Sequence, residues 1–275
     1  MTTTPTQVSG SSLRRLPAGR KAELAAFVAQ TGEVTVADLA DRFEVSTDTI
    51  RRDLDSLDAE GVLVRTHGGA VSIDAIPKPD TGVDVRVRLQ AENKERIGVL
   101  AATLVHDDDA VIVNAGTTAL TLTRTLSERR NLTIATNNLR LAAELSPAVY
   151  RDLYVFGGNL RHSAQATVGP VRIPATADGP EIDIRCDVAL IGVGAVSVES
   201  GYSTSNVAEA SMMSDMMDRA DKVAILADQS KFGRRLFATI AGLGRADYLV
   251  TDAEPPTELR QALDSEGVEL MIARR

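Results

Sequence analysis

The sequence has no tryptophan, a single cysteine and few aromatic side chains, which make up 3% of its 275 residues. Because Cys186 is alone, no intrachain disulfide can form, and this is typical of proteins from a reducing compartment. We therefore expect a cytoplasmic protein. His106 and His162 do not belong to a cluster of histidine and cysteine residues, so we expect no metal site and no cofactor.

Long hydrophobic runs are also absent. No apolar stretch approaches the roughly 20 residues that cross a bilayer, and the Ser/Thr-rich N-terminus lacks the hydrophobic segment of a signal peptide. We expect a disordered tail over residues 1–15 and no membrane partner. The apolar content of 44% is sufficient for hydrophobic cores, and the length suits one small and one large domain.

An excess of positive charge is missing as well, because 30 Lys and Arg residues stand against 38 Asp and Glu residues. This balance argues against strong non-specific binding to nucleic acid, which depends on neutralising phosphates. The basic residues near the N-terminus are nevertheless grouped, at Arg14, Arg15, Arg20 and Lys21, then at Arg51 and Arg52. A local basic patch is compatible with a negative net charge.

Residues 16–72 have the pattern of a winged helix-turn-helix. A helix is predicted from Pro17 to about Gln30, and the segment from Glu33 to Ser46 predicts a second short helix and a tight turn. Ser46 is a good N-cap for a third helix. Gly61 then predicts a turn into a β-hairpin that carries Arg65 and His67. Such a module places its third helix in the DNA major groove.

The start of the third helix and the hairpin supply the candidate DNA contacts. Arginine can bind guanine or phosphate through two parallel hydrogen bonds, and recognition helices contact bases near their N-terminus. The predicted partner is double-stranded operator DNA. The residues predicted to contact it are Ser46, Thr47, Thr49, Arg51, Arg52, Arg65 and His67.

A linker is predicted over residues 73–90, because the Pro-rich segment from Ile76 to Gly82 suits neither a helix nor a central strand. Residues 91–275 then alternate short apolar strands with helices, the pattern of a mostly parallel, doubly wound α/β sheet. The predicted strands are 110–113, 132–135, 153–156, 188–191, 223–226, 248–250 and 269–272, and the predicted helices are 92–105, 117–128, 138–145, 206–220 and 257–266.

Polar motifs follow several of these strands, at the sheet edge where ligands of α/β proteins bind. Asn114–Thr118 follows one strand and opens a predicted helix, whose free amides and dipole favour an anion such as a phosphate group. Lys231, after another strand, adds an ammonium group. The residues predicted to bind this ligand are Asn114, Gly116, Thr117, Thr118, Asn137, Gly158, Arg161, Asp228 and Lys231.

Both halves of the chain resemble the DeoR family of bacterial repressors. The resemblance is carried by Val45–Leu54 and His67–Ala70 in the N-terminal part, and by Gly116–Thr118, Thr136–Asn137, Gly157–Gly158 and Asp228–Gly233 in the C-terminal part. It implies a homo-oligomeric repressor, a dimer or tetramer, of a sugar or nucleoside operon. It also implies a phosphorylated sugar as effector, and a sheet similar to those of ribose-5-phosphate isomerase and glucosamine-6-phosphate deaminase.

Two features depart from related sequences. The family usually has Asp where this chain has Asn114. The related isomerases carry acids in a loop after a strand, whereas the matching stretch here, Ile191–Gly194, has none. A proton transfer next to a carbonyl needs such acids, so we expect a regulator rather than an enzyme. An active phosphosugar isomerase or deaminase, and a C-terminal domain that only assembles the oligomer, remain the alternatives.

Overall fold

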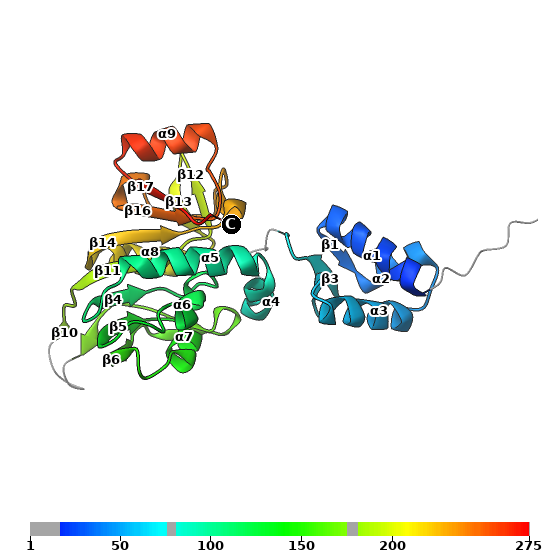
Figure 1. The fold of residues 1–275 in the computed structure, drawn as a ribbon, viewed down its shortest axis with the longest axis horizontal. Helices are drawn as coiled ribbons and strands as arrows, with labels where there is room; N and C mark the ends of the chain where they lie inside the picture. Colours follow the sequence, from blue (N-terminus) through cyan, green and yellow to red (C-terminus); the bar gives the residue numbers. More distant parts are fainter. Residues whose placement is uncertain (1–16, 76–80, 175–180, 275) are drawn as a thin grey trace, which may run out of the picture. The chain divides into compact units, whose positions relative to one another are not determined.

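The structure, a computed structural model, describes residues 17–75, 81–174 and 181–274. The chain forms two compact units, Met1–Ala75 and Ile76–Arg275 (Figure 1). The expected disordered tail over residues 1–15 lies outside the described residues. None of the helices in the described ranges is long and apolar enough to cross a membrane.

Within residues 17–75, the first unit contains three helices and a three-stranded antiparallel sheet. Its core is built from one face of each helix, with Leu24, Leu39 and Ile50 fully buried. The sheet order is β1-β3-β2. The elements are α1 (Pro17–Thr31), β1 (Glu33–Thr35), α2 (Val36–Phe43), α3 (Thr47–Ala59), β2 (Leu63–Arg65) and β3 (Gly69–Ser72).

Strand β1 was not predicted from the sequence. Its residues pair with β3, so that Val34 lies opposite Ala70 and Thr35 opposite Gly69. A Cβ atom on Gly69 would lie 1.9 Å from the carbonyl oxygen of Val34, so this pairing requires glycine at that position. The strand forms because of a partner more than thirty residues away, which local patterning does not reveal.

The second unit is built on a seven-stranded sheet in which every neighbouring pair is parallel. The strand order is β17-β16-β14-β11-β4-β5-β6, so the chain winds outward in both directions from the β4–β11 pair. The strands are β4 (Ala110–Val113), β5 (Leu132–Thr136), β6 (Tyr150–Val155), β11 (Cys186–Gly192), β14 (Ala220–Leu226), β16 (Tyr248–Thr251) and β17 (Glu269–Ile272). The predicted fold class, a winged helix-turn-helix followed by a doubly wound parallel sheet, is confirmed.

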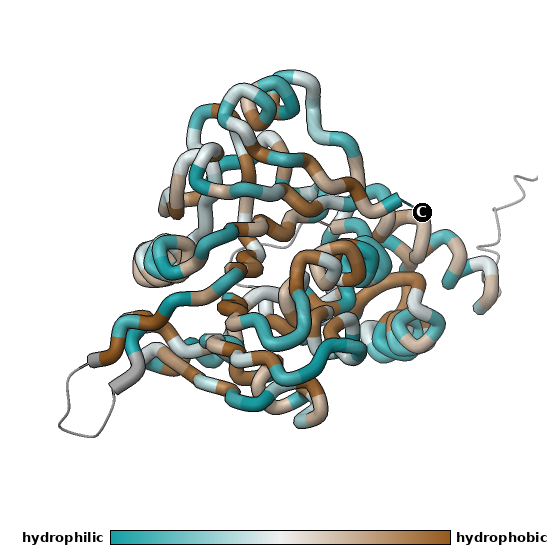
Figure 2. Tube along the Cα trace, turned by 60° about the vertical axis from the view of Figure 1, so that its left-hand side comes forward, coloured by the Kyte–Doolittle hydropathy of each residue, from teal (hydrophilic) through white to brown (hydrophobic). Residues whose placement is uncertain are grey.

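Helices cover both faces of this sheet, and alternate residues of each strand point to opposite layers. Val111 and Val113 pack with α5 (Ala91–Ala101), α6 (Leu122–Thr125) and α7 (Leu139–Glu144), whereas Ile112 packs with α8 (Val207–Asp218) and α9 (Thr257–Ser265). In Figure 2 the apolar stretches follow the strands in the middle of the unit. Because all seven strands are parallel, their carboxyl ends lie along the same side of the sheet.

Several elements of this unit depart from the predictions. The predicted linker over residues 73–90 contains a helix, α4 (Val83–Arg88). The predicted helix over 117–128 is instead a turn followed by the short helices η2 (Ala119–Thr121) and α6. Further short helices and strands, most of them two to four residues long, were not predicted from the sequence. They are η1 (Ala102–Leu104), η3 (His162–Ala164), η4 (Gln229–Lys231), η5 (Leu243–Arg245), β7 (Asn159–Arg161), β8 (Ala166–Val168), β9 (Ile173–Pro174), β10 (Glu181–Ile182), β12 (Ala195–Ser197), β13 (Gly201–Thr204) and β15 (Ala238–Ala241).

Candidate functional site

The N-terminus of α3 is closed by its own hydroxyl groups. The Ser46 side chain accepts a hydrogen bond from the Thr49 amide at 3.2 Å, and its Oγ lies 2.9 Å from Thr49 Oγ1. This satisfies one of the free amides at the helix start. Both residues were predicted to contact DNA, and the structure gives their hydroxyls a role in the cap.

Other residues of α3 and the wing present their side chains to solvent. Thr47, Arg51 and Arg52 are exposed on α3, and His67 is exposed between β2 and β3. Arg51 Nη1 lies 2.9 Å from Asp48 Oδ1, with both side chains more than half exposed. An ion pair this exposed contributes about 0–1 kcal/mol, so Arg51 can exchange Asp48 for a phosphate or a base at little cost.

Arg65 and Asp53 serve the fold of the first unit. Arg65 donates from Nε to Asp55 at 3.0 Å and from Nη1 to the Gly69 carbonyl at 3.1 Å, which ties the wing to α3. Asp53 is buried and accepts two hydrogen bonds from Arg20, at 2.6 and 3.2 Å. Of the predicted DNA contacts, Arg65 therefore has the side chain least available to DNA.

The second unit has a pocket at the carboxyl ends of β4 and β11, where the strand order reverses direction. Open α/β sheets bind ligands at this point because the chains leaving the two strands diverge there. Seven of the nine predicted ligand-binding residues line it, and these are Asn114, Gly116, Thr117, Thr118, Asn137, Arg161 and Lys231.

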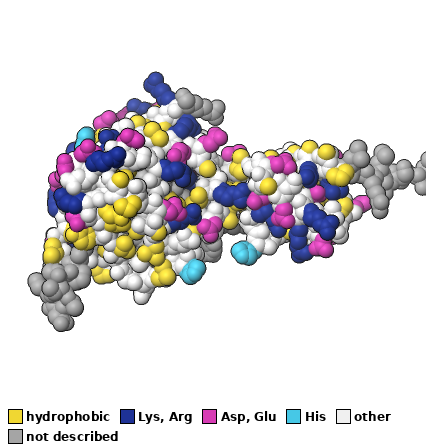
Figure 3. All heavy atoms as spheres, turned by 60° about the horizontal axis from the view of Figure 1, so that its bottom comes forward, with side chains coloured by type: hydrophobic (Ala, Val, Ile, Leu, Met, Phe, Trp, Pro, Cys, Tyr) yellow, Lys and Arg dark blue, Asp and Glu magenta, His cyan; other side chains and the backbone are white. Residues whose placement is uncertain are grey.

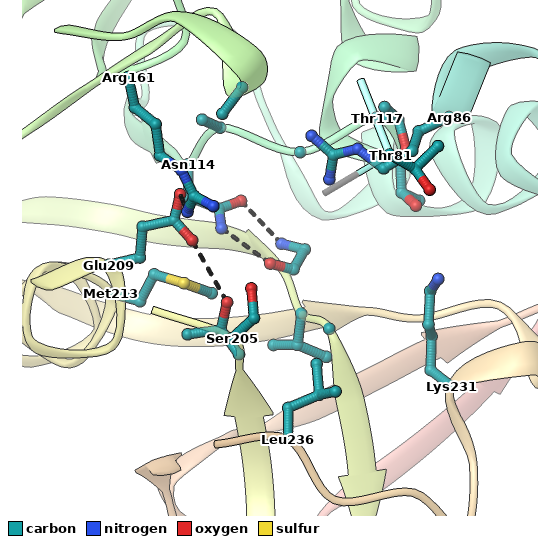
Figure 4. A pocket seen from close by; sticks show the side chains of 18 of the residues that line it. Thr81, Arg86, Asn114, Thr117, Arg161, Ser205, Glu209, Met213, Lys231 and Leu236 are labelled. Atoms are coloured by element: carbon teal, nitrogen blue, oxygen red, sulfur yellow. Dashed lines mark hydrogen bonds and ion pairs between the residues drawn. The ribbon is translucent and has the colours of Figure 1, made fainter. Parts of the chain in front are cut away.

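Two asparagines that line the pocket use their amides to bind backbone groups of neighbouring segments. The Asn114 amide bridges the strand ends, because its Nδ2 donates to the Gly192 carbonyl and its Oδ1 accepts from the Gly192 amide, both at 2.8 Å (Figure 4). Asn137 accepts from the Ala115 amide at 2.7 Å and donates to the Thr167 carbonyl at 2.8 Å. Both residues were predicted to bind the ligand, and these contacts give their amides a structural role at the strand ends.

The turn over residues 116–118 follows Asn114 in the chain and lines the same pocket. Thr117 is half-buried and lines the pocket, and Thr118 is buried with its carbonyl accepting from Thr121 Oγ1 at 2.7 Å. The predicted helix dipole is weak here, since the turn leads into one 3-10 turn and a four-residue α-helix. Anion binding at this turn must depend on amides, hydroxyls and nearby cations.

The cations near this turn are largely buried side chains, and Lys231 is one of them. Lys231 lies with its Nζ 3.9 Å from Asp228 Oδ2, and its side chain is only 13% exposed. Burial lowers the pKa of the Lys231 ammonium, and Arg234 and Arg86 oppose the raising effect of Asp228. Asp228 itself is fully buried, does not line the pocket and accepts hydrogen bonds from Ser230.

Two of the cations, Lys94 and Arg86, were missed by the sequence analysis. Lys94 is 4% exposed, and burial lowers its pKa to about 7. Burial also lowers the pKa of the Arg86 guanidinium, whose Nε is buried without a hydrogen-bond partner among the described residues. A signal existed for Lys94, because it shares the buried face of α5 with Ile97, Gly98 and Ala101, where an apolar residue is expected.

The remaining predicted residues differ in their roles. Arg161 Nη1 forms an ion pair with Glu209 Oε1 at 2.5 Å, and Glu209 also accepts from Thr204 Oγ1 at 3.3 Å. Figure 4 shows this pair toward one end of the pocket and Arg86 with Thr117 toward the other. Gly158 does not line the pocket, because its amide donates to the Val168 carbonyl and supports the β7–β8 hairpin.

The charges of the pocket are unbalanced. Among the residues that the structure describes, five basic side chains line it (Arg86, Lys94, Arg161, Lys231 and Arg234), against one acidic side chain, Glu209. Desolvating like charges is costly unless an opposite charge joins them. The arrangement therefore suits an anionic ligand with polar groups that can reach the Arg161–Glu209 pair. Across the described ranges, no group of three His, Cys, Asp or Glu side chains could hold a metal ion.

Comparison with known proteins identifies both units. Residues 20–75 match the model of the DeoR-like helix-turn-helix domain, and residues 89–253 match that of the DeoR C terminal sensor domain. The HTH-type transcriptional regulator GlpR of Haloferax volcanii is 34% identical over 253 residues, covering 92% of this chain and 96% of that protein. The HTH-type transcriptional repressor GlcR of Bacillus subtilis is 32% identical, covering 90% and 93%.

A third relative and one solved structure complete the comparison. The glycerol-3-phosphate regulon repressor of Escherichia coli is 28% identical and covers 90% of this chain and 95% of its own. Ribose 5-phosphate isomerase A from Methanocaldococcus jannaschii aligns with a TM-score of 0.36 at 15% identity, covering 54% of this chain and 56% of its own. A likeness of that strength supports no conclusion about function.

Proposed function

The chain belongs to the DeoR family of DNA-binding transcriptional regulators, and from that premise we propose that it represses a sugar-metabolism operon under the control of a phosphorylated sugar. The effector binds the pocket of the second unit. Its phosphate lies at the Thr117–Thr118 turn with Lys231 as counter-charge, and its hydroxyl groups reach Arg161 and Glu209. The relatives are named transcriptional regulators, and this chain is a regulator rather than an enzyme.

The observation that carries this proposal is the excess of basic over acidic side chains among the described residues that line the pocket at the strand ends. A phosphate dianion would neutralise Lys231 and its cationic neighbours and accept hydrogen bonds from the Thr117 hydroxyl and the turn amides. Hydrogen bonds to charged groups are about twice as strong as neutral ones, so the phosphate dominates affinity. A sugar without phosphate would leave this excess of positive charge in the pocket unchanged.

On the DNA side, we propose that Thr47, Arg51, Arg52 and His67 make the contacts, with Ser46 and Thr49 holding the helix start in place. Arg51 and Arg52 reach bases or phosphates of the major groove, and the wing carries His67 toward the backbone. Arg65 supports the wing through Asp55 and Gly69, and acts on DNA only through that support.

Control by the effector requires that it bind the DNA-competent and DNA-incompetent states with different affinity. Coupling of about 1–3 kcal/mol, which is typical, changes operator affinity by roughly 5- to 150-fold. The experiment begins with an operator selected from a random duplex library. Fluorescence anisotropy then follows binding to this operator while phosphosugars and their unphosphorylated counterparts are titrated.

Lys231→Gln and Thr117→Val test the site in the same assay. We expect a phosphosugar to shift operator affinity of the wild type and to fail with Lys231→Gln, while DNA binding without ligand is unchanged. If every phosphosugar leaves operator affinity unchanged and calorimetry detects no binding, the pocket is not an effector site. The second unit would then serve assembly alone.

We also propose that the second unit forms homo-oligomers, and the β6 edge is the candidate interface. β6 ends the sheet, and Tyr154 and Val155 on this strand are exposed, as is Leu160 on β7. Exposed apolar edge strands are prone to pair with another chain. Figure 3 shows hydrophobic side chains gathered on the forward face of the second unit. Light scattering on wild type and Val155→Lys tests this, and a wild-type monomer at micromolar concentration would refute it.

A further inference from the structure

Helix α4 is tied to side chains of two other helices, Lys94 on α5 and Arg140 on α7, whose Nη1 lies 3.1 Å from Asp84 Oδ1. The helix has only six residues and is anchored by the buried side chains of Val83 and Leu89. Lys94, on α5, donates from Nζ to the carbonyls of Arg86 and Leu89, both at 2.5 Å. An ammonium group at a helix C-terminus satisfies carbonyls that have no partner within the helix. The position of α4 therefore depends in part on Lys94.

The same lysine also faces the pocket. An ammonium group has three N–H donors, and two of those of Lys94 are occupied by the carbonyls of α4. Lys94 lines the pocket, and its electrostatic neighbours there are Asp228, Lys231 and Arg86. Two of these three neighbours carry the same charge as Lys94. The third N–H is thus available to an acceptor that also compensates the surrounding cations.

Arg86 also has a donor that the protein does not use. Its guanidinium carries five N–H groups, yet Nε is buried and has no hydrogen-bond partner within the part of the chain that the structure describes. Leaving a buried donor unsatisfied is unfavourable, and more so when the group is charged. Arg86 lines the pocket and interacts with Glu209 and Arg161 through space. An anionic acceptor between Arg86 and Lys94 would satisfy both.

We propose that Arg86 and Lys94 bind the ligand's phosphoryl group jointly with Lys231 and the Thr117–Thr118 turn, so that the bound ligand ties α4 to the strand ends. The inference rests on the proposed function, and it adds that the phosphate is held from two separate parts of the chain. One part is the strand-end loops. The other is α4, the first described helix after residues 76–80, which connect the two units in sequence.

A phosphate bridge of this kind gives the effector a route to the DNA-binding unit. Without ligand, α4 is held by Lys94, by the Asp84–Arg140 ion pair and by two buried side chains. With ligand, Arg86 on α4 becomes bonded through the phosphate to Lys231 and Thr117. A ligand that binds only one arrangement of α4 shifts the population toward it. The start of the second unit, which follows the DNA-binding unit in sequence, is then anchored more firmly.

Hydrogen exchange on the full-length protein tests this inference. Exchange of the amides of residues 83–90 is compared in inorganic phosphate and in sodium chloride of matched ionic strength, then with a sugar phosphate and a nucleoside monophosphate. We expect each phosphoryl compound that binds to slow exchange in α4 several-fold. Arg86→Gln should lose this protection and bind the ligand at least about tenfold more weakly, as loss of a charge-assisted hydrogen bond predicts.

Matched variants separate the possible outcomes. Arg185→Gln removes an exposed arginine that does not line the pocket, and this variant should behave as wild type. Arg86→Lys keeps the positive charge and should bind the ligand more tightly than Arg86→Gln does. If the ligand binds and requires Lys231, while Arg86→Gln binds normally and α4 exchange is unchanged, this inference fails and the proposed function stands. If no phosphoryl compound, inorganic phosphate included, binds the wild type, both fail.

Discussion

The low pKa of Lys94 predicts a pH dependence of ligand binding that can be worked out from the structure. Burial lowers this pKa to about 7, with Lys231 and Arg86 acting in the same direction against Asp228. A neutral amine keeps two N–H groups, enough for the carbonyls of Arg86 and Leu89, and turns its lone pair toward the pocket. Only the protonated form presents a donor to a phosphate.

Ligand affinity should therefore fall as the pH rises above about 7. If the neutral form contributes nothing, affinity falls about tenfold between pH 8 and pH 9, or about 1.4 kcal/mol per unit. Below pH 7 the affinity is limited by protonation of the ligand's phosphate, whose second pKa is about 6. Maximal affinity is expected between these two values. Binding at pH 8 should take up close to one proton, because the ligand restores the charge of Lys94.

Calorimetry in buffers of different ionisation enthalpy measures this proton uptake directly. Lys94→Met should abolish the alkaline decline, whereas Lys222→Met, which removes an exposed lysine paired with Asp247, should retain it. A wild-type affinity that is flat from pH 7 to 9 would refute this role of Lys94, and so would an alkaline decline as steep in Lys94→Met as in wild type.

The same pKa affects stability. Between pH 7 and the usual lysine pKa of about 10.4, the unfolded chain holds a proton that folded Lys94 lacks. The free energy of unfolding contributed by this group should rise across that window, and Lys94→Met should remove the rise.

Three further predictions concern other parts of the chain. Arg51→Ala/Arg52→Ala should weaken operator binding and lower the salt slope by about one for each phosphate that is no longer neutralised, without changing Tm; anisotropy across salt concentrations that matches wild type would contradict this. Asn114→Asp should destabilise the protein by about 1–3 kcal/mol, because the Gly192 carbonyl loses its donor, and a denaturant midpoint equal to wild type would show the bridge to be unimportant. Gly116→Ala should leave thermal stability nearly unchanged but weaken ligand binding, since its Cβ would meet protein atoms no closer than 3.8 Å; thermal melts and calorimetry of this one variant decide whether the space belongs to a ligand.

Features that depend on local order could be predicted from the sequence. Ser46 followed by inward-facing Ile50, Leu54 and Leu57 is sufficient to predict α3, because capping and helical periodicity act within one turn or two. The alternation of apolar strands with helices likewise predicted the parallel sheet. Polar motifs after the strands indicated its ligand-binding edge, since parallel strands must end on the same side.

Which polar groups already have partners could be learned only from the folded chain. Asn114 and Asn137 are polar residues at strand ends and were therefore predicted to bind the ligand. Each uses its amide to bind backbone groups up to 78 residues away. Arg65 is a basic residue that was predicted to contact DNA, and its side chain instead holds the wing.

Arg86 and Lys94 show the opposite case, because they line the pocket although the sequence did not indicate it. Arg86 lies in the segment predicted to be a linker. Lys94 lies at a helix position where the periodicity predicts an apolar residue. Whether a polar atom has already found its partner depends on which distant residues the fold brings within about 3 Å of it. Local sequence carries no record of that, because the partners come from other strands and helices.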